Sequence, residues 1–186
     1  MTEVLYEKRL LRVEEYEEMG RTGILGPEER VELIHGEIVR MSPQNPLHSD
    51  CIERLTHLFV ERLQGKARVR VQLPVTLDDW NAPEPDLAIV RSQSYAERHP
   101  GPKDIFLVVE VAVTTLAYDR QVKLPLYAGA GVPEVWIVNF DDRVVEVYRD
   151  PANGGYSVMQ VNGTGAEVGI AMLPEMGPFK VEEILG

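Results

Sequence analysis

The sequence is short of cysteine and of positive charge, and each shortage limits what the protein can be. Its one cysteine, Cys51, excludes an internal disulfide and a metal site built from several thiolates. Lysine and arginine together number 19 against 30 aspartates and glutamates, which gives a formal net charge of -11. This counts against binding of nucleic acid over a broad basic surface, because phosphate contacts favour positive charge. Positive charge gathered on one face, or a bound cation, would still allow such a partner.

Long apolar runs are also missing. No stretch approaches the ~20 consecutive apolar residues that span a bilayer. The N-terminal stretch Met1–Glu7 lacks a basic region followed by apolar residues, so we expect no secretory signal there. Together these absences predict a cytoplasmic protein with no membrane partner.

The composition is typical of one globular domain. The chain has 186 residues, of which 44% are hydrophobic and 26% are charged. This length is enough to bury a sizeable core. The sequence contains no repeat, low-complexity tract or linker, so we expect residues 1–186 to form a single domain.

The first third of the chain predicts two helices and a hairpin. Acidic, helix-forming residues over Val13–Met19 precede Gly20, and Val31–Met41 resembles two short strands about a His-Gly turn. From Leu47 to Leu63, apolar residues recur at three- and four-residue spacing, which predicts an amphipathic helix.

Strands dominate the rest of the chain. Leu87–Val90, Ile105–Val113 and Pro133–Asn139 are almost entirely apolar, which predicts central strands buried on both faces. Further elements are expected over residues 67–73 (strand), 118–130 (helix), 144–148 (strand) and from Pro151 onward (edge strands). The order predicts a mixed α/β domain with one central sheet flanked by helices, an extra N-terminal hairpin and extra C-terminal strands.

Two acidic residues at strand ends carry the functional argument. Asp86 begins the apolar stretch Leu87–Val90, and Glu110 lies near the end of Ile105–Val113. A carboxylate at a strand end is usually solvated or caps a helix, but Glu110 has apolar neighbours on both sides. A buried carboxylate needs a cation, a hydrogen-bond partner or a raised pKa. If the two strands are neighbours, both side chains could reach one ion.

The residue types in this set favour a divalent cation. Mg²⁺ or Mn²⁺ accepts carboxylates, backbone carbonyls and waters as ligands, so Asp86, Glu110 and the Val111 carbonyl are the expected ligands. Such a cation lowers the pKa of bound water and polarises a phosphoryl oxygen. Lys123, in the following helix, could orient the water or stabilise charge on a phosphodiester. The set predicts a metal-dependent nuclease with Asp86, Glu110 and Lys123 as its catalytic residues.

Several motifs together resemble a known family. They are Pro85-Asp86, Val108-Val109-Glu110-Val111, Tyr118-Asp119-Arg120 with Lys123 and Tyr127, and Ala130–Val138. This combination is similar to that of the Uma2-like (DUF820) family of the PD-(D/E)XK nuclease superfamily. The hairpin Glu32–Val39 and the following Met41-Ser42-Pro43 resemble the N-terminal signature of that family, and the likeness covers roughly residues 10 to 150.

The resemblance implies a restriction-endonuclease-like core and cleavage of DNA with Mg²⁺ or Mn²⁺. It also implies that Asp86 and Glu110 bind the cation. The superfamily pattern has a lysine two positions after the acidic residue, where this chain has Ala112. The resemblance implies that Lys123, from the next helix, replaces it.

Five further residues are candidates for the same site: Glu37, His48, Asp119, Gln121 and Tyr127. Glu37 follows the hairpin turn and could add a ligand or be solvated. His48 opens a helix and could contact metal or phosphate, or be a polar first-turn residue. Asp119 and Tyr127 would share one helix face with Lys123, with Tyr127 as a core aromatic whose hydroxyl reaches the site, whereas Gln121 would point away.

Two other classes of function stay open. The fold could serve as a non-catalytic binding or assembly module, which Ala112 and the net charge favour. It could also be a phosphoesterase acting on a small molecule, which an acidic surface tolerates better than DNA. A homo-oligomer such as a dimer is expected, because the tail from Pro151 offers strand edges that a second subunit could cover.

Overall fold

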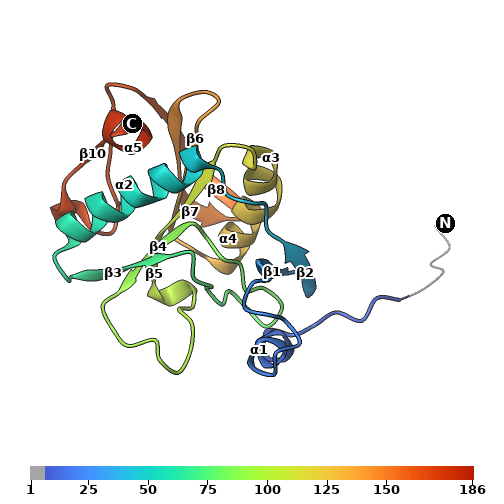
Figure 1. Ribbon diagram of the computed structural model, residues 1–186. Coiled ribbons are helices and arrows are strands. Elements are labelled where there is room, and N and C mark those ends of the chain that lie inside the picture. Colours follow the sequence, from blue (N-terminus) through green and yellow to red (C-terminus); the bar gives the residue numbers. More distant parts are fainter. Residues whose placement is uncertain (1–6) are drawn as a thin grey trace.

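A six-stranded mixed sheet runs through the centre of the computed structural model (Figure 1). The structure describes residues 7–186, so the first six residues of the N-terminal stretch considered above lie outside it. The strand order is β3 (Ala67–Val71), β4 (Leu87–Arg91), β5 (Ile105–Ala112), β6 (Glu134–Asn139), β7 (Val144–Ala152) and β8 (Gly155–Gly163). β5 and β6 are parallel, and all other neighbouring pairs are antiparallel. The predicted mixed α/β class is confirmed.

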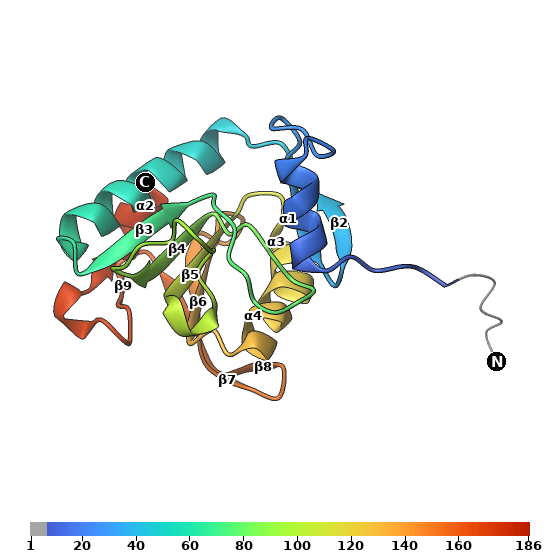
Figure 2. The same ribbon diagram turned by 90° about the horizontal axis from the view of Figure 1, so that it is seen from below.

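Helices cover both faces of the sheet (Figures 1 and 2). On the α2 face, α2 (Pro46–Leu63) crosses the strands with α5 (Val181–Leu185) beside it. The α4 face carries α3 (Leu116–Tyr118), the π-helical turn η2 (Asp119–Lys123) and α4 (Leu124–Ala130). None of the described helices combines the length and apolar character that a bilayer crossing requires.

The N-terminal part packs outside the main sheet. It consists of α1 (Val13–Arg21) and the hairpin of β1 (Val31–Ile34) with β2 (Glu37–Arg40). His35 and Gly36 both have positive φ, 51° and 74°, as the tight turn between two hairpin strands requires. A Cβ at Gly36 would come within 2.7 Å of the Leu10 Cβ, so glycine is needed there for space as well.

Short elements complete the chain. They are the 3-10 turns η1 (Pro102–Asp104) and η3 (Pro174–Met176), and a small sheet of β9 (Glu167–Val168) with β10 (Phe179–Lys180). β10 carries Phe179 into the core on the α2 face, where its ring meets Phe59 and Trp136 at centroid distances of 5.1 and 6.0 Å. The C-terminal segment thus packs directly against α2.

Most predicted elements are confirmed to within about two residues of their ends. This holds for α1, the hairpin, α2 and the strands β3 to β6. The tail supplies the edge strand β8 as expected and the short strands β9 and β10, and it also forms the helix α5, which the sequence did not predict. Five residues are too few for a helical period to show in the sequence, and α5 is held by burial of Val181, Ile184 and Leu185.

The predicted helix over residues 118–130 is not regular. Pro125 has no backbone N–H, and its ring obstructs the carbonyl four residues earlier, so the sequence favours a kink there. The structure instead widens the preceding turn, and the Leu124 N–H bonds to the Asp119 carbonyl five residues back. Turns of this kind are rare and are frequently found at functional sites.

The aromatic contact between β10 and α2 generates a stability prediction. Phe179→Ala should lower the free energy of unfolding by about 3–5 kcal/mol, because it leaves a cavity beside two fully buried rings. Urea denaturation measures this loss. Val60→Ala, at an exposed position of α2, should change stability by less than about 0.5 kcal/mol. A comparable small change for Phe179→Ala would contradict the packing described.

Candidate active site

Antiparallel pairing of β4 with β5 brings Asp86 and Glu110 together. The register pairs Leu87 with Val109, so one further step sets Asp86, just before β4, opposite Glu110. Side chains alternate along a strand. Leu87 and Val109 belong to the core of the α2 face, and therefore Asp86 and Glu110 point to the α4 face. The Asp86 N–H also lies 3.4 Å from Glu110 Oε2.

Asp86 is held through one of its two carboxylate oxygens. Its Oδ2 accepts a hydrogen bond from the Val111 N–H at 2.8 Å and lies 3.1 Å from His48 Nε2. His48 stands in the first turn of α2, where its own N–H donates to the Asn45 side chain that caps the helix. Within the described chain no residue donates to Asp86 Oδ1, so this oxygen is available to a ligand.

Glu110 and Lys123 form a buried ion pair. They are 3% and 5% exposed, and Lys123 Nζ lies 3.1 Å from Glu110 Oε1. The Tyr127 hydroxyl donates to the same oxygen at 2.6 Å, so Tyr127 is a core aromatic whose hydroxyl reaches the site. The expected burial of Glu110 is therefore present in the structure, together with two partners that stabilise its charge.

Glu32 completes this group and was missed in the sequence. Its Oε2 lies 3.4 Å from Lys123 Nζ and accepts the Glu84 N–H, while its Oε1 accepts the Tyr118 hydroxyl. The signal was available, because Glu32 stands between Val31 and Leu33 in an apolar strand, as Glu110 does in its own. The hairpin is present as predicted, but its charged residue in the cavity is Glu32 and not Glu37.

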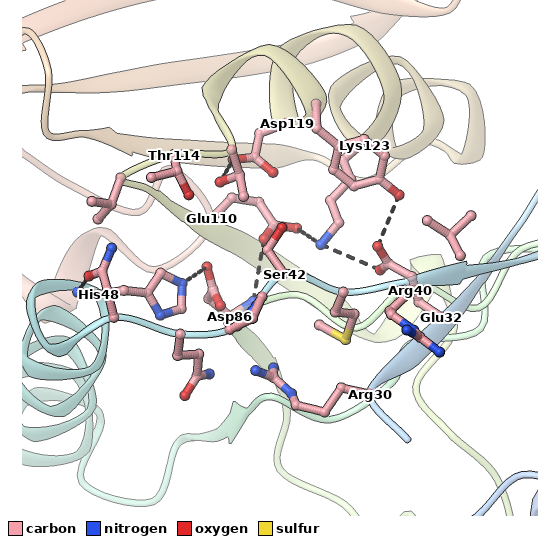
Figure 3. Close-up of a pocket in the computed structure, with 18 of the residues that line it drawn as sticks. Arg30, Glu32, Arg40, Ser42, His48, Asp86, Glu110, Thr114, Asp119 and Lys123 are labelled. Carbon is pink, nitrogen blue, oxygen red and sulfur yellow. Dashed lines mark hydrogen bonds and ion pairs between the residues drawn. The ribbon is translucent and has the colours of Figure 1, made fainter. Parts of the chain in front are cut away.

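These residues line one cavity of about 410 Å³ (Figure 3). Its walls include Glu32, Asp86, Glu110, Asp119, Lys123 and His48. Asp119 is 3% exposed and accepts a hydrogen bond from the Thr115 hydroxyl at 2.7 Å. Four carboxyl groups thus face one lysine, which leaves an excess of negative charge inside the cavity.

The pKa values of the site reflect this excess. Burial raises the pKa of Glu110 to about 8, and the Asp86 and Asp119 charges add to the rise against the opposing effect of Lys123. Burial likewise raises the pKa of Asp119 to about 6. For Lys123, burial acts to lower the pKa, but Glu110, Glu32 and the other carboxylates outweigh it and keep the ammonium charged.

The donor set fits a hard divalent cation. Asp86 Oδ1 is open, and Glu110 Oε2 accepts only a long bond from the Asp86 N–H, so both carboxylates retain lone pairs. Mg²⁺ characteristically uses one or two carboxylates and several waters. In the described part of the chain, no three His, Cys, Asp or Glu side chains are grouped as a ready metal cage. The ligands that could hold a cation here are therefore the carboxylates of Asp86 and Glu110, together with a backbone oxygen and water.

The remaining candidates divide by position. His48, Asp119 and Tyr127 are brought to the cavity or to its ligands, as described above. Glu37 is not, because its half-exposed side chain points outward and pairs with Lys8 at 2.8 Å. Gln121 is exposed and lies outside the cavity, as its helix position predicted.

A second buried network holds the π-helical turn against the sheet. Arg120 of η2 pairs with the fully buried Glu146 of β7, with Nε 3.1 Å from Oε2. Glu146 also accepts hydrogen bonds from Asn139 and the Tyr148 hydroxyl. This anchor fixes the turn that carries Asp119 and Lys123 and so fixes where their side chains enter the cavity.

Comparison with protein families gives one match over most of the chain. The family model Uma2, described as "Putative restriction endonuclease", matches residues 13–179. No curated protein matches the sequence.

Comparison with solved structures gives the same fold. A DUF820 protein from Anabaena variabilis ATCC 29413, described as a "putative nuclease", superposes with a TM-score of 0.72 at 15% identity and covers 94% of this chain and 97% of that one. The type IIG restriction endonuclease BpuSI has a TM-score of 0.45 at 16% identity, covering 78% of this chain and 17% of its own. The Anabaena structure supports the fold, and at this identity the fold alone.

The raised pKa of Glu110 generates a prediction about stability and pH. Unfolding returns this carboxyl to its usual pKa near 4.5, so between pH 4.5 and about 8 the folded state binds more protons. Ionisation of Glu110 therefore lowers the stability of the parent protein as pH rises through this window, and Glu110→Gln removes this contribution. The Tm of the variant minus that of the parent, measured in chelator, should grow by several degrees from pH 5 to 8 and then level off.

Glu37→Gln is the matched control, because this glutamate is half exposed. Its Tm difference should be flat with pH. A flat difference for Glu110→Gln as well would show that Glu110 ionises normally in the folded protein.

Proposed function

Because the chain belongs to the Uma2 family, we propose that it is a nuclease that hydrolyses phosphodiester bonds of DNA with Mg²⁺ or Mn²⁺. The observation that carries the proposal is the convergence of three side chains on one cavity: Asp86 from just before β4, Glu110 from β5 and Lys123 from η2. A divalent-cation site beside a buried ammonium suits the negative charge of a phosphodiester.

Asp86 and Glu110 are the proposed cation ligands, with the Val111 carbonyl as a third. A bound divalent cation would lower the pKa of a coordinated water and polarise a phosphoryl oxygen. The Val111 N–H and His48 keep the Asp86 carboxylate in one orientation. Glu110 must give up its proton for this role, and Lys123 and Tyr127 stabilise the charged form.

Lys123 is proposed to assist the chemistry from beside the cation site, because its ammonium lies 3.1 Å from Glu110 Oε1. Its ammonium would donate hydrogen bonds to non-bridging phosphate oxygens as charge grows on them. This charge grows as a water oxygen forms its bond to the phosphorus and the bond to the leaving oxygen breaks; the proton that the water loses is replaced, through solvent, by one taken up at the leaving oxygen. Glu32 keeps Lys123 in place, since it binds the same ammonium and is itself held by Tyr118.

One observation favours a second candidate, the non-catalytic binding or assembly module. The ammonium of Lys123 already contacts Glu110 and Glu32, so the polar network is largely satisfied without a cation. A small-molecule phosphoesterase is the third possibility, because a cavity of about 410 Å³ can enclose a small ligand.

Calorimetric titration of Mn²⁺ tests the cation site. The parent protein should bind Mn²⁺, and Asp86→Asn should lose at least about tenfold in affinity because it removes a charged ligand. Glu37→Gln removes the same charge outside the cavity and should bind like the parent. Equal binding by Asp86→Asn and the parent would place the cation elsewhere.

Cleavage assays with DNA separate the three functions. In Mn²⁺, Lys123→Met should lower kcat by about 10²-fold or more with little change in KM, if the ammonium acts mainly in the transition state. Cation binding without cleavage of single- or double-stranded DNA would favour the module. Cleavage of a small phosphodiester with no activity on DNA would favour the phosphoesterase.

We also propose that two copies pair through β8. This edge strand has nine residues and no charged side chain, although 26% of the chain is charged, and Met159 and Val161 on it are exposed. Natural edge strands are usually protected by charge, proline or short length. Each copy carries a net charge of -11, so two copies repel each other over most of their surface. Pairing through β8 brings no charged side chains of this strand together.

Sedimentation velocity tests the pairing. The parent should sediment as a dimer, and Val161→Lys should shift it towards monomer by placing like charges at the shared edge. Val60→Lys, at an equally exposed valine of α2, should leave the dimer intact. A parent that is monomeric at all concentrations would refute the pairing.

A further inference from the structure

Two arginines of the hairpin stand at the rim of the cavity (Figure 3). Arg30 immediately precedes β1 and Arg40 ends β2. The two strand ends are tied together, because Val31 pairs with Arg40 and the Met41 N–H donates to the Arg30 carbonyl at 2.9 Å. The hairpin therefore presents both guanidinium groups on the same cavity that contains the carboxylates.

These two arginines make almost no ionic contact with other side chains of the described residues. Within the described residues, Arg40 is exposed and makes neither an ion pair nor a side-chain hydrogen bond. Arg30 has one ionic contact, with Glu84 at 3.9 Å, which is too long for a hydrogen bond. By contrast, the Arg120 guanidinium is bound to a buried carboxylate. Arg30 and Arg40 are therefore free to bind an anion.

A third source of positive potential lies on the same cavity. The 18-residue helix α2 begins at its wall, where Asn45 and His48 are both exposed to the cavity space. The N-terminus of a helix carries a partial positive charge, and the first turn of α2 has no acidic residue to offset it. The cavity thus has a carboxylate wall and a cationic rim.

We propose that Arg30 and Arg40 bind the phosphate next to the scissile one, so that the substrate is a polynucleotide strand and not a small phosphoester. This rests on the proposed nuclease function. The carboxylate wall with its cation serves the reacting phosphodiester, and guanidinium groups suit a second phosphate because they can donate paired hydrogen bonds. A substrate with one phosphate has no group for this rim to bind.

Two substrates of different size test this assignment in Mn²⁺. For a single-stranded oligodeoxynucleotide, Arg40→Gln should lower kcat/KM by about tenfold, mainly through KM, because a charged hydrogen bond is lost. For bis(4-nitrophenyl) phosphate, which has one phosphate, kcat/KM should be unchanged. Arg40→Lys should recover part of the loss, since it restores the charge without the paired donors.

Binding measurements test the rim independently of catalysis. Fluorescence anisotropy with a phosphorothioate oligonucleotide, over a series of salt concentrations, gives the slope of log K against log salt. Arg40→Gln should reduce this slope by about 0.7, the value for one phosphate contact on a single strand. Arg68→Gln removes an exposed arginine of β3 outside the cavity, and its slope should match the parent.

The outcomes separate this proposal from the nuclease function. The proposed phosphate contact would be refuted if Arg40→Gln lowered kcat/KM equally on both substrates. It would also be refuted if Arg40→Gln left the slope of log K against log salt unchanged. If the parent cleaves neither substrate, the nuclease function fails, and the slope still decides the phosphate contact. Urea midpoints equal to that of the parent would show that the variants are folded.

Discussion

A buried ammonium that several carboxylates share is the interaction on which this site depends. Lys123 lies within 3.4 Å of both Glu110 and Glu32, and all three side chains are almost fully buried. Removing any of these charges from water is costly unless an opposite charge accompanies it. The sheet, the hairpin and η2 must therefore be in place together before any of them can bury its charge. One ammonium cannot balance four carboxyl groups, and this imbalance is what makes the cavity attract protons and cations.

Each part of the fold contributes a position to this arrangement. The β4–β5 register sets Asp86 across from Glu110, and the hairpin brings Glu32 from a segment more than 50 residues earlier in the chain. Arg120 and Glu146 fix η2 on the sheet. The outer rim of the cavity carries the guanidinium groups of Arg30 and Arg40 and not carboxylates. Opposite charge on its wall and its rim is what the proposed function needs, with a cation at the wall and an anionic polymer at the rim.

The central residues were predictable because their sequence context is unusual. Glu110 interrupts an apolar run, and an acidic residue there must find a partner. The same signal is present at Glu32, which interrupts the apolar strand β1, but a strand of four residues does not reveal which of its faces is buried. The widened turn at η2 was not predictable, because Pro125 indicates a disturbance without specifying its form. α5 was missed since its helical state depends on contacts with α2, far away in sequence. The sequence therefore did not predict the two features that depend on long-range contacts or on local backbone distortion, which are α5 and the widened turn η2.

The π-helical turn also determines how this part of the chain can change over evolution. Its exposed positions, such as Gln121, can accept many side chains without disturbing the cavity. Gain of one further residue between Thr115 and Lys123 would instead rotate the residues that follow by roughly 100°, because an α-helix advances by that angle per residue and this turn is already widened. Lys123 would leave the carboxylates, and Tyr127 would leave Glu110. Homologous chains should therefore differ here by substitution, while insertions and deletions accumulate in loops such as the one before β5.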